Sequence, residues 1–196
     1  MNGRPELPFA RHLPLTREAI EFANERHFGQ RREADSGDFM LHLLEVAALL
    51  DRSKYPDQVV AAAVLHDVLE HTDVEREELE RRFGPEVAGL VAMVSDHPGI
   101  ADEDERKAEL RQRVRGAGGD AAAIYAADKI SKVRELRLMA ASGRSGPETV
   151  VARRRYQDSL AMLEDVMPDD RLVTLLRVEL EALDEFSPVP RPATAE

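Results

Sequence analysis

The stretch Ala61-Ala62-Ala63-Val64-Leu65-His66-Asp67-Val68-Leu69-Glu70-His71-Thr72 decides the fold and marks the place where chemistry is expected. It begins as an almost purely apolar run and ends in polar side chains. The apolar part, residues 59–65, fits a helix that is buried on most of its sides. A His-Asp pair at the end of such a helix costs free energy unless a metal ion or a dense hydrogen-bond network satisfies it.

Four polar side chains of this stretch would face one way if the helix continued to residue 72. They are His66, Asp67, Glu70 and His71. At about 100° per residue they fall within an arc of roughly 140°. One helix would then present two imidazoles and two carboxylates to a common point. The stretch therefore predicts a candidate site, and other segments must supply the remaining partners.

The composition is typical of a globular, helical protein with a heavily charged surface. The chain has 196 residues, 43% hydrophobic and 33% charged, which is enough for one domain with a good core. Aromatic residues make up only 5%, which favours helices over sheet. The net charge of -11 argues against a nucleic-acid or membrane surface. A phosphorylated ligand stays possible, because a local basic pocket or a metal outweighs the global field.

The chain also lacks the features of a secreted or membrane protein. It has no cysteine, so neither disulfides nor thiolate metal sites are expected. The first residues contain arginines and prolines without an apolar run, so we expect no signal peptide. No apolar stretch approaches transmembrane length. The simplest expectation is a cytoplasmic protein.

Proline and glycine divide the chain into one domain with two flanking segments. Residues 1–14 contain three prolines and are predicted to form an extended arm. Residues 15–186 are predicted to form a single helical domain. Residues 187–196 again hold three prolines and are predicted to be a disordered tail.

Hydrophobic periodicity predicts an all-α domain of about eight or nine helices with short connections. Thr16 is the predicted N-cap of the first helix. A short helix is predicted from Asp73, closed by Gly84, and residues 102–115 read as a charged surface helix. The other predicted helices cover residues 39–51, 57–72, 85–94, 120–139, 147–166 and 170–186.

The helix over residues 120–139 repeats the design of the opening stretch. Residues 121–127 are nearly all apolar and lead directly into Asp128 and Lys129. A buried aspartate needs a cation, a metal or several hydrogen-bond donors. From the spacing alone, a metal site and a salt bridge with Lys132 or an arginine are equally good interpretations of Asp128.

His42, the pair His66-Asp67 and Asp128 resemble, in this order, the H…HD…D signature of the HD-domain superfamily of metal-dependent phosphohydrolases. The surrounding motifs resemble the Rel/Spo-homologue hydrolase domain, and the chain length is similar to that of the small, stand-alone alarmone hydrolases. The matching segments are HFGQRR (27–32), GDFMLHLLEVA (37–47), VLHDVLEHT (64–72), FGPEVAGLV (83–91) and AADKI (126–130). The family patterns are H-x-G-Q-x-R, Y-x-x-H-P-x-x-V-A, LLHDVVEDT, FG-x-x-VA-x-LV and LADKL. The resemblance covers about residues 19–140.

The resemblance implies an all-α HD-domain bundle that holds one divalent metal ion. The implied ligands are His42, His66, Asp67 and Asp128. Manganese is the most frequent metal in this branch, and iron, cobalt, nickel, zinc and magnesium remain alternatives. Two imidazoles with two carboxylates suit a borderline-hard transition metal.

The resemblance also implies a reaction and further site residues. The family reaction removes the 3′-pyrophosphate from guanosine tetra- or pentaphosphate, so the implied partner is a small phosphorylated nucleotide. Glu70 would position or deprotonate the attacking water, with His71 beside it. Arg32 would contact the nucleotide, and Lys129 would meet phosphate charge. The oligomeric state does not follow from the sequence.

Three residues depart from the family pattern. His71 replaces the second acid of a Glu-Asp pair, Lys132 replaces an asparagine, and Leu43 replaces a proline. Histidine can serve as a general base near neutral pH, so His71 could replace the missing acid. Alternatively, His71 abolishes the activation of the water or indicates another substrate. Lys132 suits a substrate phosphate, or it pairs with Asp128 and weakens metal binding.

Three hypotheses follow from these residues. The first is an alarmone-type 3′-pyrophosphohydrolase, active or altered in specificity. The second is a metal-dependent phosphomonoesterase that acts on another nucleotide. The third is a degenerate HD protein that binds a nucleotide or a partner without turnover. The presence of all four implied ligands and of Glu70 favours an enzyme.

Overall fold

The computed structural model describes residues 7–32 and 36–186, and their α-helices surround one central helix. No β-strand occurs in these two ranges, so the prediction of an all-α fold is confirmed. No helix among the described residues is long and apolar enough to cross a membrane. The elements are η1 (Pro8–His12), α1 (Pro14–Arg26), α2 (Phe39–Arg52), α3 (Asp57–Leu65), α4 (Val68–His71), α5 (Arg76–Val94), α6 (Glu103–Ala117), α7 (Gly119–Ala141), α8 (Pro147–Val166) and α9 (Arg171–Phe186).

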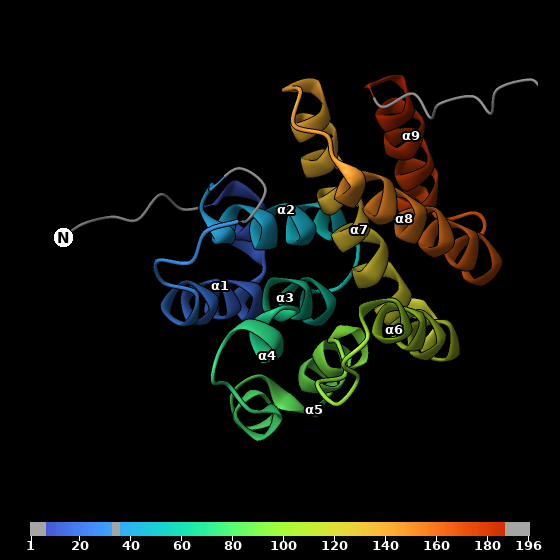
Figure 1. Ribbon diagram of the computed structural model, residues 1–196. Helices are drawn as coiled ribbons and strands as arrows, with labels where there is room; N and C mark the ends of the chain where they lie inside the picture. The colour runs from blue at the N-terminus through green and yellow to red at the C-terminus, as the bar shows by residue number, and fades with distance from the viewer. Residues whose placement is uncertain (1–6, 33–35, 187–196) are drawn as a thin grey trace, which may run out of the picture.

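Helix α7 crosses the molecule and packs against most other helices (Figure 1). Helices α2 and α3 lie on one side of it, with α1 beyond α3, and α8 and α9 lie on the other. Helices α5 and α6 pack at its N-terminal half. Because α2, α3 and α7 share one core, polar residues at corresponding levels of the three helices meet inside the molecule.

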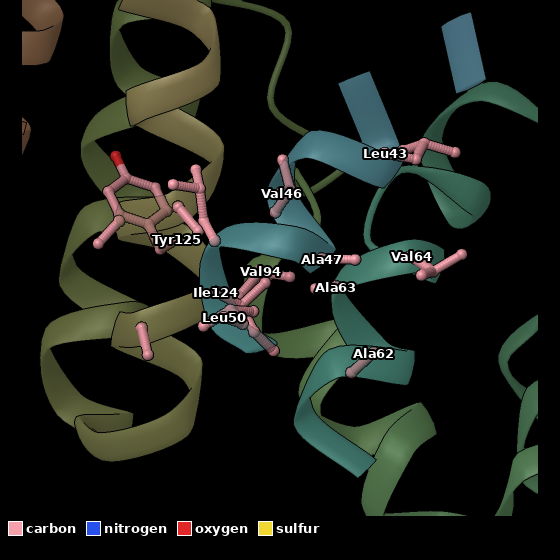
Figure 2. Packing of buried hydrophobic residues seen from close by; sticks show 14 of the residues in the cluster. Leu43, Val46, Ala47, Leu50, Ala62, Ala63, Val64, Val94, Ile124 and Tyr125 are labelled. Atoms are coloured by element: carbon pink, nitrogen blue, oxygen red, sulfur yellow. The ribbon is translucent and has the colours of Figure 1, made fainter. Parts of the chain in front are cut away.

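The core around α3 is built from small and branched apolar side chains. Every residue from Val59 to Leu65 is fully buried. Ala47 and Leu50 of α2 and Ile124 of α7 meet this surface (Figure 2). The alanines of α3 allow its backbone to approach α2 closely. The close packing fixes the position at which α3 ends and delivers His66.

The prediction of one helix over residues 57–72 is wrong in one respect. Helix α3 ends at Leu65, a turn occupies His66 and Asp67, and the short helix α4 begins at Val68. Asp67 has φ -96° and ψ -2°, only a modest departure from helical angles. Helix propensity does not detect so small a deviation. The turn buries the side chains of His66 and Asp67, while Glu70 and His71 stay exposed.

Three local predictions need correction. Helix α5 begins at Arg76 rather than near Asp73, whereas the predicted break at Gly84 is confirmed, because its φ of +86° and ψ of 163° interrupt the helical conformation and produce a kink. The arm predicted as extended contains the 3-10 helix η1. Helix α1 begins at Pro14, so Thr16 lies inside it and is not its N-cap. The predicted tail, residues 187–196, lies outside the described residues, and the domain boundaries remain a prediction.

Helix α1 is capped by a residue from another helix. The carboxylate of Asp57, the first residue of α3, accepts hydrogen bonds from the backbone N–H groups of Leu15 and Thr16, each at 2.9 Å. It also accepts one from the Thr16 hydroxyl at 2.6 Å. The N-terminal N–H groups of a helix need such acceptors. Asp57 therefore ties α1 to the N-terminus of α3, which leads to the candidate site.

Replacement of Asp57 by alanine is expected to lower the free energy of unfolding by about 2 kcal/mol, because several donors lose one acceptor. Urea denaturation followed by circular dichroism measures this change. Asp102→Ala removes the exposed cap of α6, which accepts only from the N–H of Glu105, and serves as a control expected to cost about 1 kcal/mol. A smaller loss for Asp57→Ala than for Asp102→Ala would contradict the inter-helix cap.

Candidate metal centre

The structure brings four predicted site residues from three places in the fold into one buried cluster. His42 comes from the first turn of α2, His66 and Asp67 from the turn between α3 and α4, and Asp128 from the middle of α7. Their exposed fractions are only 3–5%. The apolar starts of α3 and α7 place these polar groups inside the core, as the sequence pattern predicts.

The ligand atoms of this cluster face one another. Nε2 of His42 lies 3.2 Å from Nε2 of His66 and 3.2 Å from Oδ1 of Asp128. Nε2 of His66 lies 3.3 Å from Oδ1 of Asp67 and 3.5 Å from Oδ1 of Asp128. Oδ2 of Asp67 is 3.6 Å from Nε2 of His42. The four side chains thus converge on a space of the size that one metal ion needs.

Hydrogen bonds at the far side of each imidazole fix which nitrogen carries the proton. Nδ1 of His66 lies 2.7 Å from the carbonyl oxygen of Ala63, which only accepts, so this nitrogen donates. Nδ1 of His42 lies 3.0 Å from Oγ of Ser131, whose own hydroxyl donates to Glu45 at 2.6 Å. Nδ1 of His42 therefore also donates. In the neutral forms both Nε2 atoms carry lone pairs.

This arrangement fits a divalent cation. When both imidazoles are neutral, two nitrogen lone pairs face each other at 3.2 Å and repel, and the two carboxylates beside them favour a cation at this point, either a proton on Nε2 of His66 or a metal ion. A metal ion between these atoms would accept electron density from all of them. Each imidazole also donates a hydrogen bond from its Nδ1, and such bonds orient histidine ligands in metal sites. The residues present therefore match the nitrogen and oxygen ligand set of a transition metal.

Burial and charge act on the pKa values in opposite directions here. Burial lowers the pKa of His42 despite its hydrogen bond to Asp128. For His66, burial is outweighed by the charges of Asp67 and Asp128, and the pKa is raised. Both carboxyl groups have pKa values well below the ordinary range, because neighbouring cationic groups outweigh their burial. Asp67 and Asp128 are therefore ionised at neutral pH, as metal ligands must be.

Two lysines pair with Asp128. Nζ of Lys129 lies 2.5 Å from Oδ2, and Nζ of Lys132 lies 3.0 Å from Oδ1. Lys129 is buried and also lies over the ring of Tyr125, 4.3 Å from its centroid. Lys132 is partly exposed. Of the two effects predicted for Lys132, the structure shows the ion pair with the carboxylate.

Glu70 and His71 lie at the rim of the cluster, and both are exposed. Oε1 of Glu70 accepts a hydrogen bond from the N–H of Asp96 at 2.8 Å. Partial burial and the charge of Asp67 raise the pKa of Glu70. The backbone oxygen of His71 accepts from Nε2 of Gln30 at 2.9 Å. Asp67, Glu70 and His71 each offer one ligand atom within 4.8 Å of the others, so they are neighbours in space.

The motif at residues 27–32 forms a turn that supports this rim. Gly29 has φ of +78°, a conformation that favours glycine. Nδ1 of His27 donates to Oε1 of Gln30 at 2.8 Å, and Gln30 holds His71. Nε of Arg32 lies 3.3 Å from Oε1 of Glu135 on α7. The turn thus fixes His71 and places Arg32 beside the cavity.

A cavity of about 730 Å³ lies against the cluster, and its wall is strongly basic. Eight arginine and lysine residues line it, against three acidic residues. All five predicted catalytic and substrate-binding residues, Arg32, Glu70, His71, Lys129 and Lys132, are among the lining residues. A basic cavity in a chain of net charge -11 indicates a polyanionic ligand.

Helices α6 and α8 contribute cavity residues that the sequence analysis did not identify. Lys107 and Arg111 come from α6, and Arg155 and Tyr156 from α8. The prediction that residues 102–115 form a surface helix is therefore incomplete, because one face of α6 lines the cavity. The four-residue spacing of Lys107 and Arg111 puts them on one helix face, which was the available signal. It cannot be distinguished from an ordinary solvated face by sequence alone.

A family model described as HD domain matches residues 19–144. Among curated proteins, MESH1 of Drosophila melanogaster, a guanosine-3′,5′-bis(diphosphate) 3′-pyrophosphohydrolase, is 30% identical over 129 residues, which are 64% of this chain and 72% of that protein. Human MESH1 is 32% identical over 61% of this chain and 68% of its own length. The pyrophosphohydrolase of Aquifex aeolicus is 32% identical over 65% of this chain but only 18% of its own length.

Solved structures show the same fold. A structure described as a metazoan ortholog of SpoT that hydrolyzes ppGpp and plays a role in starvation responses has a TM-score of 0.74 and 24% identity, over 88% of this chain and 94% of that one. A protein of Listeria monocytogenes EGD-e has a TM-score of 0.66 and 24% identity, over 74% of this chain and 99% of its own. Since the family model matches well over half of it, the chain belongs to the HD domain family.

Proposed function

We propose that this protein is a metal-dependent phosphohydrolase that removes the 3′-pyrophosphate from guanosine tetra- or pentaphosphate or from a closely related nucleotide. The observation that carries the proposal is the buried cluster of His42, His66, Asp67 and Asp128 beside a basic cavity. The curated relatives named as guanosine-3′,5′-bis(diphosphate) 3′-pyrophosphohydrolases support the choice of substrate.

His42, His66, Asp67 and Asp128 would hold one divalent ion, for which we propose Mn²⁺. When bound, such an ion lowers the pKa of a coordinated water and polarises a phosphate oxygen. The two facing imidazole nitrogens and the ionised carboxylates support this assignment. These are the atoms that a hydrolytic metal requires.

Glu70 is the proposed general base. The N–H of Asp96 holds its Oε1, and the other carboxylate oxygen remains available for a proton. In the proposed step a water oxygen attacks the phosphorus attached to the 3′-oxygen, the bond from phosphorus to that oxygen breaks, and a proton passes to Glu70. The 3′-oxygen leaves with a proton from the solvent, so the products are the 3′-hydroxyl nucleotide and pyrophosphate. His71, held at its backbone by Gln30, assists Glu70 in orienting the water.

Arg32, Lys129 and Lys132 are proposed to bind the substrate. All three side chains line the cavity, and the two lysines border the metal cluster. Lys132 is partly exposed and can exchange its Asp128 partner for a phosphate oxygen. The positive charge that surrounds the reacting phosphorus then offsets the negative charge of the pyrophosphoryl group that the water attacks.

A second function is favoured by His71 and Lys132, the two departures from the family pattern that lie at the cavity. Both alter groups that would contact the reacting phosphate or the water. A phosphomonoesterase that acts on another nucleotide would use the same metal cluster. The two functions differ in the product, which is pyrophosphate in the first and orthophosphate in the second.

We expect the wild-type protein to bind one equivalent of Mn²⁺ and Asp67→Asn to bind none. Metal bound to the folded state stabilises it, by about 2.7 kcal/mol at a hundredfold excess over the dissociation constant. Metal analysis and thermal denaturation with and without Mn²⁺ measure both effects. Asp165→Asn, at an exposed surface ion pair with Arg115, is the matched control and should behave as wild type. Full metal binding by Asp67→Asn would contradict the ligand assignment.

Lys132→Asn restores the family residue and removes a positive charge that lies 3.0 Å from Asp128. We expect Mn²⁺ to bind at least about tenfold more tightly in this variant. The metal no longer has to displace the Lys132 ammonium from Asp128, which costs about 1.4 kcal/mol of binding free energy. Titration calorimetry measures the affinity, with Lys54→Asn, which changes a turn residue after α2, as control. Unchanged or weaker binding in Lys132→Asn would show that the ammonium does not compete with the metal.

A substrate panel separates the two functions. The Mn²⁺-loaded protein is incubated with guanosine tetraphosphate, its adenosine analogue and deoxynucleoside monophosphates. We expect pyrophosphate release from guanosine tetraphosphate, and a higher rate for His71→Asp, because the second acid of the family is restored. Orthophosphate release from the monophosphates alone, with no gain for His71→Asp, would favour the phosphomonoesterase.

A further inference from the structure

A continuous row of hydrogen bonds leads from the outer side of His42 to helix α9. Nδ1 of His42 lies 3.0 Å from Oγ of Ser131, which lies 2.6 Å from Oε2 of Glu45. Oε1 of Glu45 accepts from a terminal nitrogen of Arg134 at 2.8 Å. Nε of Arg134 donates to Oε1 of Glu179 at 2.6 Å. The row therefore connects α2, α7 and α9.

The proton positions in this row are determined by chemistry. An ionised Glu45 only accepts hydrogen bonds, and Arg134 only donates them. The hydroxyl of Ser131 must then donate to Glu45, and its lone pair accepts from Nδ1 of His42. His42 is thereby fixed in the tautomer whose Nε2 lone pair faces His66. A reversal of the hydrogen bond between Ser131 and Glu45 would reverse this tautomer.

The far end of the row is buried and balanced in charge. Glu179 is only 6% exposed, and its Oε2 lies 2.8 Å from a terminal nitrogen of Arg137. Ser131, Arg134 and Arg137 follow Asp128 at intervals of three residues, and each interval turns the side chain by about 60° around α7, from the metal cluster towards α9. Carboxylate and guanidinium groups alternate along the row. This pairing holds the carboxylate of Glu45 in the ionised form that accepts from Ser131.

We propose that Glu45 and Ser131 are positioning residues that set the tautomer of His42 for metal binding, and that Glu179 of α9 holds them in place through Arg134. Helix α9 lies outside residues 19–144, the part that the HD domain model matches. The C-terminal helix thus contributes to the metal centre although it provides no ligand. The inference rests on the metal site of the proposed function, but its main test needs neither metal nor turnover.

Glu45→Gln is the sharpest test, because it is nearly isosteric and reverses the proton direction. Arg134 needs an acceptor, so the glutamine oxygen turns to it and the amide NH₂ group faces Ser131. The hydroxyl of Ser131 then donates to Nδ1 of His42, and the ring proton moves to Nε2. Long-range proton–nitrogen NMR spectra of the metal-free protein report the tautomer directly. We expect a change from the Nδ1–H to the Nε2–H form, and Mn²⁺ binding weaker by about 10- to 100-fold.

Further variants separate positioning from a purely structural role. Ser131→Ala should weaken Mn²⁺ binding, and Ser131→Thr, which keeps the hydroxyl, should restore it. Glu179→Gln should give a smaller loss than Glu45→Gln, because it acts through Arg134. Glu164→Gln is the matched control, since Glu164 pairs with Arg177 between α8 and α9 and lies outside the row. It should change neither the tautomer nor the affinity.

The proposal is overturned if Glu45→Gln and Ser131→Ala keep the Nδ1–H tautomer of His42, even when both variants lose thermal stability. That result would make the row a structural tie between α7 and α9. A wild-type protein that binds Mn²⁺ but hydrolyses no nucleotide would contradict the proposed function only. A wild-type protein without metal affinity would contradict the metal site, and the tautomer in the metal-free variants would still decide between positioning and structure.

Discussion

The close approach of two imidazole nitrogens, 3.2 Å apart inside the core, is the constraint on which the rest of the site depends. Nε2 of His42 and Nε2 of His66 face each other with two ionised carboxylates beside them. Such an arrangement is unfavourable by itself, and it is maintained because the apolar faces of α2, α3 and α7 hold the backbones in place. The core thus provides the stability that keeps the ligand atoms together before a cation binds.

The charge distribution follows from the same cluster. An overall charge of -11 coexists with a cavity wall on which cationic side chains predominate. Lys129 and Lys132 belong to both regions, because they pair with Asp128 and also line the cavity. They stabilise the buried carboxylate of Asp128, and in the proposed function they would supply positive charge to a substrate phosphate. In the proposed function, these two lysines would therefore affect both the binding of a metal ion and the attraction of an anionic ligand.

The sequence was sufficient for the parts that depend on local patterns. Apolar runs predicted the buried helices that deliver His66 and Asp128, and the ordered motifs identified the family. The turn at Asp67 was missed because its dihedral angles stay near helical values. The Asp57 cap of α1 and the cavity face of α6 were missed because both are set by tertiary contacts. Surface helices and cavity walls carry the same charged residues, so sequence periodicity does not separate them.

The two unusual residues of the cavity act on charge in the same direction. His71 stands where the family has an acid, and Lys132 stands where the family has an uncharged asparagine. The exchange of an acid for a histidine and of an asparagine for a lysine makes this site more positive than the family pattern by at least two charges. A more positive site holds a metal cation less tightly and a polyanionic nucleotide more tightly. In the proposed function the two departures would therefore reinforce each other and shift the binding energy of the site from the metal towards the phosphates.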